Sequence, residues 1–247
     1  MKKNLLVTLA NSDYVERSKQ LFSSVWHNAG WEGDMMLLSY KIPEQDLNWF
    51  RTRGILVYEC EDIPGLGGAP GRWSAVALHK FNLFKVYFKQ WDHLLYLDSD
   101  IIVRASLDAL ISSDDGFVAV KGGHVNFRHS FFSTFQTWLE KKDTGLCKEI
   151  EKKYDMNSDV FNGGVFAFSS NCITQELFDT AVSIHNRYGS ISTCFEELTS
   201  NLLFPNWIKL PVVYNLDPDF FIKTTSLRPT DIEGVILHFI AQKPWDK

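Results

Sequence analysis

Two aspartates separated by one residue interrupt the apolar run "LLYLDSDIIV", residues 94–103. A carboxylate removed from water without a partner is costly. In a strand, residues i and i+2 point to the same side, about 6–7 Å apart, so Asp98 and Asp100 would point the same way. Carboxylate oxygens favour Mg²⁺, Ca²⁺ or Mn²⁺, and such ions often bridge to substrate phosphates. The pair therefore predicts a divalent metal site; the alternative is a solvated strand end.

A lysine lies in the middle of an apolar helical face. The helical pattern over residues 72–90 surrounds Lys80 with aromatic and aliphatic side chains, where its ammonium group cannot easily reach water. An anionic phosphate, or Asp98 or Asp100, would give Lys80 a charged partner. The alternative is a helix end from which Lys80 reaches solvent.

Two later stretches add polar groups to apolar strands. In "FNGGVFAF", residues 161–168, Asn162 can donate and accept hydrogen bonds, and two glycines let the backbone approach a ligand closely; turn chemistry alone also produces Asn-Gly-Gly. In "VILHFIAQKPW", His238 lies near the end of a strand, with Lys243 shortly after it. His238 is a candidate third metal ligand beside the carboxylates, or else a buried core histidine.

The elements that must position these residues alternate along the chain. Short runs rich in Leu, Ile and Val recur, namely "LLVTLA", "DMMLLSY", "ILVYEC", "HLLYLDSD", "GFVAV", "GVFAF" and "GVILHFI". Amphipathic patterns lie between the early runs; residues 13–29 form one, with Asp13 and Glu16 spaced as a capping box. This alternation predicts an α/β fold with a mainly parallel central sheet flanked by helices. Ligands bind such sheets beyond the carboxyl ends of their strands.

Two further segments read as insertions in this pattern. Residues 61–72, "EDIPGLGGAPGR", form a glycine-rich loop that is either a plain connection or a lid over a ligand. Its glycines lack the spacing of a dinucleotide-binding or P-loop motif. Residues 128–156 read as a longer helical insertion with charges on solvated faces.

Composition limits the function further. The chain has 247 residues, 45% of them hydrophobic, enough for one large core. A net charge of −5 argues against an electrostatic grip on nucleic acid or anionic lipid. No stretch approaches the roughly 20 apolar residues of a membrane span. Four cysteines without a C-x-x-C pair suit reduced thiols, so we expect a cytoplasmic protein.

Taken in order, these stretches resemble glycosyltransferase family 8, the retaining GT-A group that includes glycogenin and bacterial lipopolysaccharide galactosyltransferases. The matching segments are "VTLANSDY" for the nucleotide-binding first strand and turn, "ALHKFNLF" for the helix with the nucleotide-sugar lysine, "YLDSD" for the D-x-D motif, "FNGGVFAF" for the F-N-S-G-V strand, "LPVVYNLDPDF" for L-P-x-x-Y-N, and "LHFIAQKPW" for the closing H-F…K-P-W motif. The resemblance implies one GT-A (Rossmann-like) nucleotide-diphospho-sugar transferase domain over 1–247. Residues 1–105 would be its nucleotide-binding half, ending in the D-x-D, and 106–247 its acceptor and sugar half.

The resemblance also implies roles for individual residues. Mn²⁺, with Mg²⁺ as an alternative, would be held by Asp98, Asp100 and His238. The residues implied to bind the nucleotide sugar are Thr8, Leu9, Asn11, Tyr14, Lys80, Ser99, Asn162, Gly163, Gly164 and Lys243; of these, Asn11 and Tyr14 match the residues that bind and stack on uracil. The expected reaction is retaining transfer of a hexose, with a UDP-hexose as the expected donor. The acceptor, a carbohydrate, a lipid-linked molecule or a protein, is not specified.

Two departures from the family pattern fall in the site. Where the family shows G-D-Q-G-I-L-N, this chain has "FEELTSN"; alignment through Asn201 places Glu196 on the Asp and Glu197 on the Gln. His238 and Lys243 are five residues apart, whereas the family commonly uses six.

The expected catalytic residues are Glu196, Glu197, Lys80 and Asn162. Retention requires either a covalent intermediate, for which Glu196 or Glu197 is the candidate carboxylate, or same-face attack guided by the leaving group. We favour the second route, in which the two glutamates shape the sugar pocket.

Two other functions fit parts of the sequence. A D-x-D also occurs in haloacid-dehalogenase-like phosphatases, where the first Asp is the nucleophile, but it normally follows the first strand, and here it lies near residue 98. The two adjacent glutamates also leave open a catalytically inactive domain that only binds a nucleotide sugar.

Overall fold

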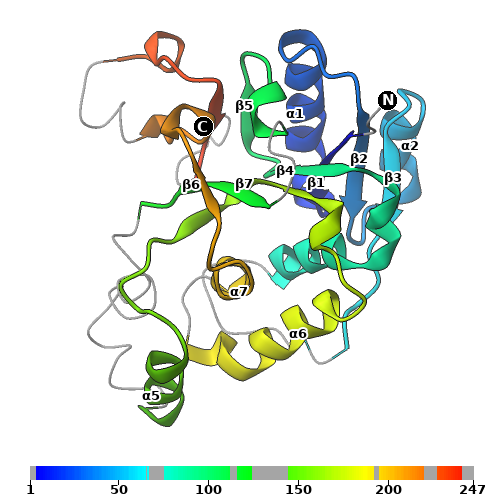
Figure 1. The fold of residues 1–247 in the computed structure, drawn as a ribbon. Coiled ribbons are helices and arrows are strands. Elements are labelled where there is room, and N and C mark those ends of the chain that lie inside the picture. The colour runs from blue at the N-terminus through cyan, green and yellow to red at the C-terminus, as the bar shows by residue number, and fades with distance from the viewer. Residues whose placement is uncertain are drawn as a thin grey trace.

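The computed structural model describes residues 4–64, 66, 75–111, 116–123, 144–191, 195–219 and 227–240. A seven-stranded sheet in the order β3-β2-β1-β4-β7-β6-β8 forms its centre (Figure 1). The strands of this sheet are β1 (Asn4–Ala10), β2 (Asp34–Ser39), β3 (Leu56–Glu59), β4 (His93–Leu97), β6 (Phe117–Lys121), β7 (Phe161–Ser169) and β8 (Ile208–Leu210). All seven apolar runs of the sequence contain strands; the last of them contains β9 (Ile236–His238), outside this sheet.

The sheet is mainly parallel, as predicted. Strands β3, β2, β1 and β4 run parallel to one another, and β8 runs parallel to β6. Only β7 runs against both of its neighbours, β4 and β6. A separate antiparallel pair joins β5 (Ile101–Val103) to β9, with Ile101 opposite His238. This pairing brings the D-x-D segment beside a residue far away in the sequence.

Both faces of the sheet are covered, which explains why its central strands are apolar throughout. In β1, Leu6 packs into one core cluster with Phe22 and Phe50, while Leu5 and Val7 pack into the other. The helices α1 (Val15–Asn28) and α2 (Glu44–Arg51) cover the first face. On the second lie the 3-10 helix η2 (Ala75–Phe84), α6 (Leu177–Tyr188) and α7 (Phe195–Leu203) (Figure 1). Such double coverage is typical of parallel sheets.

Two local predictions are wrong. The predicted capping box is absent: Ser12–Tyr14 form a 3-10 turn, α1 begins at Val15 without a side-chain cap, and Glu16 pairs with Lys19 instead. The predicted α-helix over 72–90 consists, where it is described, of η2 and a second 3-10 helix, Val86–Gln90. The residues from Leu78 to Phe84 are buried without interruption, so hydrophobic periodicity could not determine the helix type.

Two predicted segments are described only in part. The glycine-rich loop 61–72 is described to residue 64 and at residue 66, and the predicted helical insertion 128–156 is described from residue 144. There, α5 (Thr144–Lys153) confirms the later part of the insertion as helical. Among the described residues, no helix is both long and apolar enough to cross a membrane.

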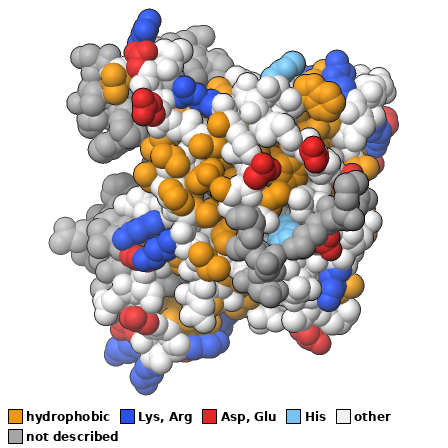
Figure 2. Space-filling view, turned by 45° about the horizontal axis from the view of Figure 1, so that its top comes forward, with side chains coloured by type: hydrophobic (Ala, Val, Ile, Leu, Met, Phe, Trp, Pro, Cys, Tyr) orange, Lys and Arg blue, Asp and Glu red, His pale blue; other side chains and the backbone are white. Residues whose placement is uncertain are grey.

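The surface carries charges of both signs. In Figure 2, hydrophobic side chains gather in the middle of the face drawn, and most Lys and Arg side chains lie toward its periphery, mixed with Asp and Glu. The described part of this face therefore shows no continuous basic patch, in keeping with the net charge of −5. We propose no binding surface on this face.

Candidate functional site

The two aspartates lie in a turn, not in a strand. Strand β4 ends at Leu97 and β5 begins at Ile101, so the predicted strand alternation does not orient the carboxylates. Backbone hydrogen bonds fix the turn instead: Asp98 N donates to Gly164 O (2.8 Å), and Phe239 N donates to Asp100 O (3.1 Å). The turn is thus held between β7 and the segment after β9. The two carboxylates converge because of these long-range contacts.

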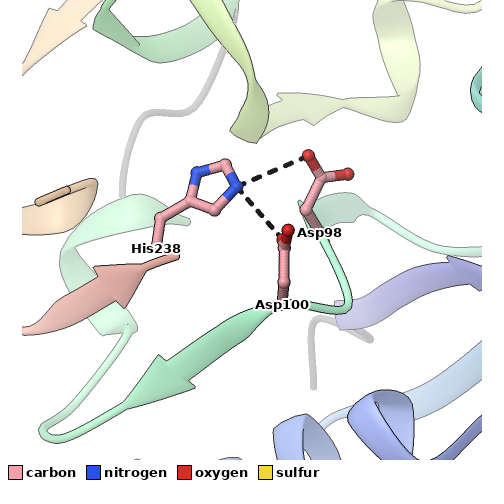
Figure 3. A group of neighbouring side chains, drawn as sticks. All are labelled: Asp98, Asp100 and His238. Carbon is pink, nitrogen blue, oxygen red and sulfur yellow. Dashed lines mark ion pairs between the residues drawn. The ribbon is translucent and has the colours of Figure 1, made fainter. Parts of the chain in front are cut away.

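His238 completes a cluster of three ligand groups (Figure 3). Its Nε2 lies 3.2 Å from Asp100 Oδ1 and 3.7 Å from Asp98 Oδ2, and one ligand atom from each residue lies within 4.8 Å of the others. The side chains of Asp98, Asp100 and His238 are 27%, 11% and 4% exposed. A Cβ at Gly164 would lie 2.2 Å from His238 Cε1, so a glycine is required beneath the ring.

The chemistry of this donor set fits a divalent cation. Two carboxylate oxygens and one imidazole nitrogen lie close enough together to bind one cation between them. Carboxylates suit Mg²⁺ and Mn²⁺. Such ions often use few protein ligands and complete their coordination with substrate phosphates and water.

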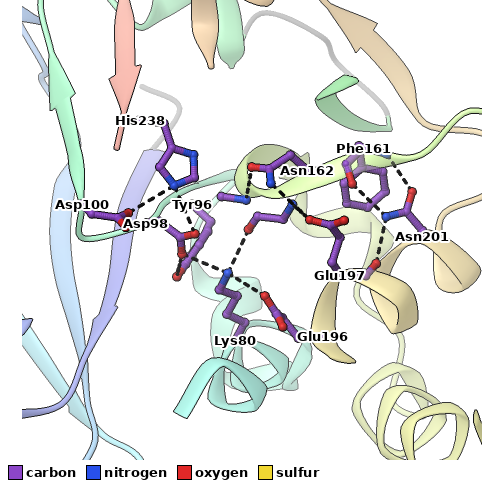
Figure 4. Close-up of polar contacts among 12 residues, drawn as sticks. Lys80, Tyr96, Asp98, Asp100, Phe161, Asn162, Glu196, Glu197, Asn201 and His238 are labelled. Atoms are coloured by element: carbon purple, nitrogen blue, oxygen red, sulfur yellow. Dashed lines mark hydrogen bonds and ion pairs between the residues drawn. The ribbon is translucent and has the colours of Figure 1, made fainter. Parts of the chain in front are cut away.

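Lys80 is a cation that contacts this cluster directly. Its side chain is 7% exposed, and Nζ lies 2.9 Å from Asp98 Oδ1, 3.2 Å from Glu196 Oε1 and 3.0 Å from Gly163 O (Figure 4). Burial disfavours the charged lysine, but the carboxylates of Asp98 and Glu196 outweigh it and raise the pKa of Lys80 above its usual value. Lys80 is therefore charged and buried, and the alternative of a lysine reaching solvent is wrong.

Asp98 divides its two oxygens between different partners. Oδ1 accepts from Lys80 and from the Tyr96 hydroxyl, at 2.9 and 2.7 Å. Burial, followed by the nearby charge of Asp98, raises the pKa of Tyr96 well above its usual value, so the phenol remains a donor. Because both donors contact Oδ1, the other oxygen, Oδ2, is left facing His238. This division leaves one Asp98 oxygen for a metal.

The adjacent glutamates at the start of α7 have different surroundings. Glu196 pairs with Lys80, whereas Glu197 Oε2 accepts from Gly163 N (3.1 Å) and Asn162 Nδ2 (3.2 Å). Burial is the main cause that raises the pKa of Glu197 to about 7, against the lowering effect of the Gly163 hydrogen bond. Part of the Glu197 population is therefore protonated near neutral pH.

Asn201 and Asn215 fix parts of the site for which sequence reasoning assigned no role. Asn201 exchanges two hydrogen bonds with the Phe161 backbone and donates a third to Glu197 O, which ties α7 to β7. Asn215 contacts His238 and Asn162. Both asparagines stand in the stretches compared with family motifs, "FEELTSN" and "LPVVYNLDPDF". Their place in these motifs was the only feature of the sequence that could have pointed to the two asparagines.

Two cavities meet at the cluster. The smaller, of about 150 Å³, is lined by Leu9, Ala10, Asn11, Tyr14, Val76, Ala77, Lys80, Tyr96, Asp98, Ser99, Asp100 and Glu196. The larger, of about 320 Å³, is lined by Asp98, Asp100, Gly122, Gly123, Asn162, Gly163, Gly164, Glu196, Glu197, His238 and Ile240. Both cavities share Asp98, Asp100 and Glu196. The cluster is therefore accessible from two sides.

Most predicted site residues lie along these two cavities, and two do not. Thr8 is fully buried in β1 and lines neither cavity; its role in binding stays a prediction. Lys243 lies outside the described residues. In the smaller cavity, the ring of Tyr14 is covered on one side by Arg17, whose Cζ lies 4.5 Å from the ring centroid, and Asn11 Nδ2 donates to Asp13 Oδ2.

Comparisons with known proteins cover nearly the whole chain. The model of Glycosyl transferase family 8 matches residues 6–247. Galactinol synthase 1 of Ajuga reptans is 24% identical over 225 residues, which are 83% of this chain and 61% of that protein. Galactinol synthase 7 of Arabidopsis thaliana is 23% identical, with 83% and 62% covered. The matched part of this chain thus spans about three fifths of these relatives.

Solved structures share the fold. An active-site mutant of LgtC matches with a TM-score of 0.73 at 18% identity, over 98% of this chain and 90% of that one. The glycosyltransferase GlyE of Streptococcus pneumoniae matches with a TM-score of 0.65 at 19% identity, over 100% and 57%. These matches confirm the predicted GT-A fold.

Proposed function

Because the chain belongs to glycosyl transferase family 8, we propose that it transfers a hexose from a UDP-sugar to an acceptor, with retention of configuration. The observation that carries this proposal is the position of Lys80, a buried cation that contacts both the D-x-D turn and Glu196 where two cavities meet. A diphosphate at that junction would find positive charge there and a cavity on either side for nucleoside and sugar.

Each cavity then receives one part of the donor. The smaller cavity, with Asn11 and Tyr14, would take the nucleoside, and the larger one the sugar. A divalent cation, Mn²⁺ or Mg²⁺, bound by Asp98, Asp100 and His238 would supply Lewis-acid stabilisation of the diphosphate leaving group. Lys80 would hold the diphosphate by charge-assisted hydrogen bonds, and Lys243 would add a second cation. Most residues that line the smaller cavity belong to the predicted half 1–105, and most that line the larger belong to 106–247.

The larger cavity favours a neutral sugar. Four carboxyl side chains line it, and no lysine or arginine does among the described residues. The carboxyl groups of Glu196 and Glu197, together with the Asn162 amide, can hydrogen-bond to sugar hydroxyls. A uronic acid would place another carboxylate among them at an electrostatic cost.

Neither glutamate is well prepared to attack the anomeric carbon. Glu196 is already paired with Lys80, and Glu197 has one oxygen held by two N–H groups and a pKa raised by burial. These contacts support the same-face route, in which the two glutamates orient the sugar. The acceptor hydroxyl would then lose its proton to the departing diphosphate as the new bond forms.

Thermal denaturation with a panel of ligands tests the proposal. UDP-glucose, UDP-galactose, UDP-glucuronate and GDP-mannose would each be added with Mn²⁺, Mg²⁺ or EDTA, since a ligand that binds only the native state raises the Tm. We expect a shift for neutral UDP-sugars that requires the metal, and a smaller one for UDP-glucuronate. No shift with any nucleotide sugar would overturn the assignment.

Two product assays separate the other functions. Phosphate release from a simple phosphomonoester without an acceptor would indicate a phosphatase. UDP-sugar binding with neither transfer nor hydrolysis, tested with a panel of acceptors, would indicate a binding domain. We expect UDP release that depends on an acceptor.

A further inference from the structure

The larger cavity is bordered by a chain of polar contacts that closes on itself. Each member contacts the next one around the ring: Asp98, Lys80, Gly163, Glu197, Asn162, Asn215 and His238. Figure 4 labels Asp98, Lys80, Glu197, Asn162 and His238 of this ring. Asn215 joins the sugar side of this ring to the imidazole. It comes from the segment before β9, between η7 (Val212–Tyr214) and Leu216.

One backbone N–H fixes the direction of the hydrogen bonds in this part of the ring. Gly164 N lies 3.0 Å from Asn162 Oδ1, and because a backbone N–H can only donate, the amide atom facing it must be the oxygen. Asn215 approaches the same oxygen at 2.9 Å, so it must present its NH₂ group there. The oxygen of Asn215 is therefore turned the other way, toward His238.

This orientation decides which nitrogen of the imidazole must carry a hydrogen. Asn215 Oδ1 lies 2.8 Å from His238 Nδ1, and an amide oxygen can only accept, so Nδ1 carries the hydrogen. In neutral His238 the lone pair is then on Nε2, the atom that faces Asp98 and Asp100. A metal ligand held through its second ring nitrogen is fixed in both tautomer and ring orientation.

We propose that Asn215 is a positioning residue for the metal site, which holds His238 with hydrogen on Nδ1 and Nε2 open to a divalent cation. The inference rests on the proposed function, because it concerns the same site. Asn162 is the support of Asn215 and also donates to Glu197. Asn162 therefore serves the metal ligand and the sugar pocket at once.

The packing around the ring agrees with this role. His238 is 3% exposed, and Gly164 both donates the N–H that orients Asn162 and leaves space for the imidazole. A rotation of the ring that exchanged its nitrogens would separate Nδ1 from its acceptor. Nε2 would then no longer face the two carboxylates.

The test compares Asn215→Leu, Asn215→Asp and Asn28→Ala with the wild type. Leucine has nearly the shape of asparagine but no polar atoms, so it removes the acceptor for His238. Aspartate keeps an acceptor for Nδ1–H. Asn28 is the matched control, because its side chain donates one hydrogen bond, to Val103 O at the far end of β5. Asn215→Ala repeats the test in case the leucine variant does not fold.

Two measurements are made on each protein. Long-range ¹H–¹⁵N NMR of the metal-free protein, with His238 assigned by a His238→Gln spectrum, reports the tautomer. Calorimetric titration with Mn²⁺ alone reports the Kd. We expect Asn215→Leu to lose the pure Nδ1–H form and to raise the Kd about 10- to 100-fold. Asn215→Asp should keep the hydrogen on Nδ1, although it loses the NH₂ donor to Asn162 Oδ1. Asn28→Ala should keep both properties close to those of the wild type.

Different results would contradict the role of Asn215 and the proposed metal site. If Asn215→Leu retains the Nδ1–H tautomer and the wild-type Kd, Asn215 is not a positioning residue, whatever the enzyme does. If the wild type does not bind Mn²⁺ or Mg²⁺ at all, the proposed metal site fails. The tautomer of the metal-free protein still decides the role of Asn215 in that case.

Discussion

Two cavities of comparable size lie at opposite edges of the same sheet and differ in the side chains that line them. The cavity at the carboxyl edge, about 320 Å³, contains Asp98, Asp100, Glu196, Glu197 and His238. The cavity at the amino edge, about 390 Å³, lies between α1 and α2 and is lined by Phe22, Ser23, Trp26, His27, Met35, Trp49, Arg53 and Ile55. Volume alone would favour the second. The carboxyl-edge cavity differs in having charged side chains that converge on one place and are held there by backbone contacts. Catalysis and metal binding require such groups.

Two polar side chains at the amino edge, Arg53 and Ser23, are engaged locally. Arg53 lies over the Trp49 ring, with its Cζ 4.2 Å from the centroid, and donates to Trp49 O. Ser23 donates to Lys19 O. These contacts belong to the surfaces of α1 and α2 and do not converge on a point in the cavity. We therefore expect substitutions at the two edges to have very different effects.

The largest effect is expected for Asp100→Asn. It keeps the shape of the side chain and removes one charge from the proposed metal site. Loss of several kcal/mol of transition-state stabilisation corresponds to a fall in kcat/KM of about a thousandfold, measured with Mn²⁺ and a UDP-sugar. The circular dichroism spectrum should be unchanged. Activity within tenfold of the wild type would remove Asp100 from the metal site.

Lys80→Met should cause the largest loss of folding stability. Removing one partner of a buried ion pair leaves uncompensated charge, here on Asp98 and Glu196, at a cost of about 3–5 kcal/mol. Lys19→Met is the comparison, because Lys19 pairs with an exposed Glu16 and such pairs contribute about 0–1 kcal/mol. Urea denaturation measures both. Equal losses would mean that the charge of Lys80 is not buried in solution.

Glu197 should make stability depend on pH. Its pKa is raised by burial to about 7, so between about pH 4.5 and 7 the folded state binds more protons than the unfolded state. Stability from this group is therefore present at low pH and lost as pH rises through 7. Glu197→Gln should remove that loss, so that at pH 8 its free energy of unfolding exceeds that of the wild type by about 2–3 kcal/mol. A pH series of urea denaturations checks this; parallel curves for the two proteins would contradict it.

The smallest effect is expected at the amino edge. Trp26 is 70% exposed, so Trp26→Ser should change the free energy of unfolding by only about 0.5 kcal/mol and leave the Kd for the UDP-sugar unchanged. Urea denaturation and calorimetry with the donor measure the two quantities. A weakened donor Kd would show that the amino-edge cavity participates in the site.

The sequence predicted the parts of this molecule that depend on local patterns. The seven apolar runs contain strands, and residues 15–28 of the predicted helix 13–29 are helical. The D-x-D turn was misassigned to a strand, since its geometry comes from hydrogen bonds to Gly164 and Phe239. The three-residue strands β5 and β8 were not separated from their surroundings, because so short a segment carries no periodicity.

The sequence predicted which residues form the candidate site better than it predicted which of them contact one another. A lysine on an apolar face and two aspartates in an apolar run are costly unless paired, and that cost pointed to Lys80, Asp98 and Asp100. No such cost marks Asn215, because asparagine is common in turns. Its importance comes from contacts with His238 and Asn162, 23 and 53 residues away. Only the three-dimensional structure brings these residues together.

The pairing of β5 with β9 has a consequence for biosynthesis. Ile101 lies opposite His238, so a ribosome has already made both aspartates long before it makes the histidine that joins them. At roughly 5–20 residues per second, the nascent chain spends on the order of ten seconds with the two neighbouring carboxylates but without the imidazole of His238. During translation the site is thus incomplete until β9 emerges, and β9, the last strand in the described part of the chain, is the one that assembles it.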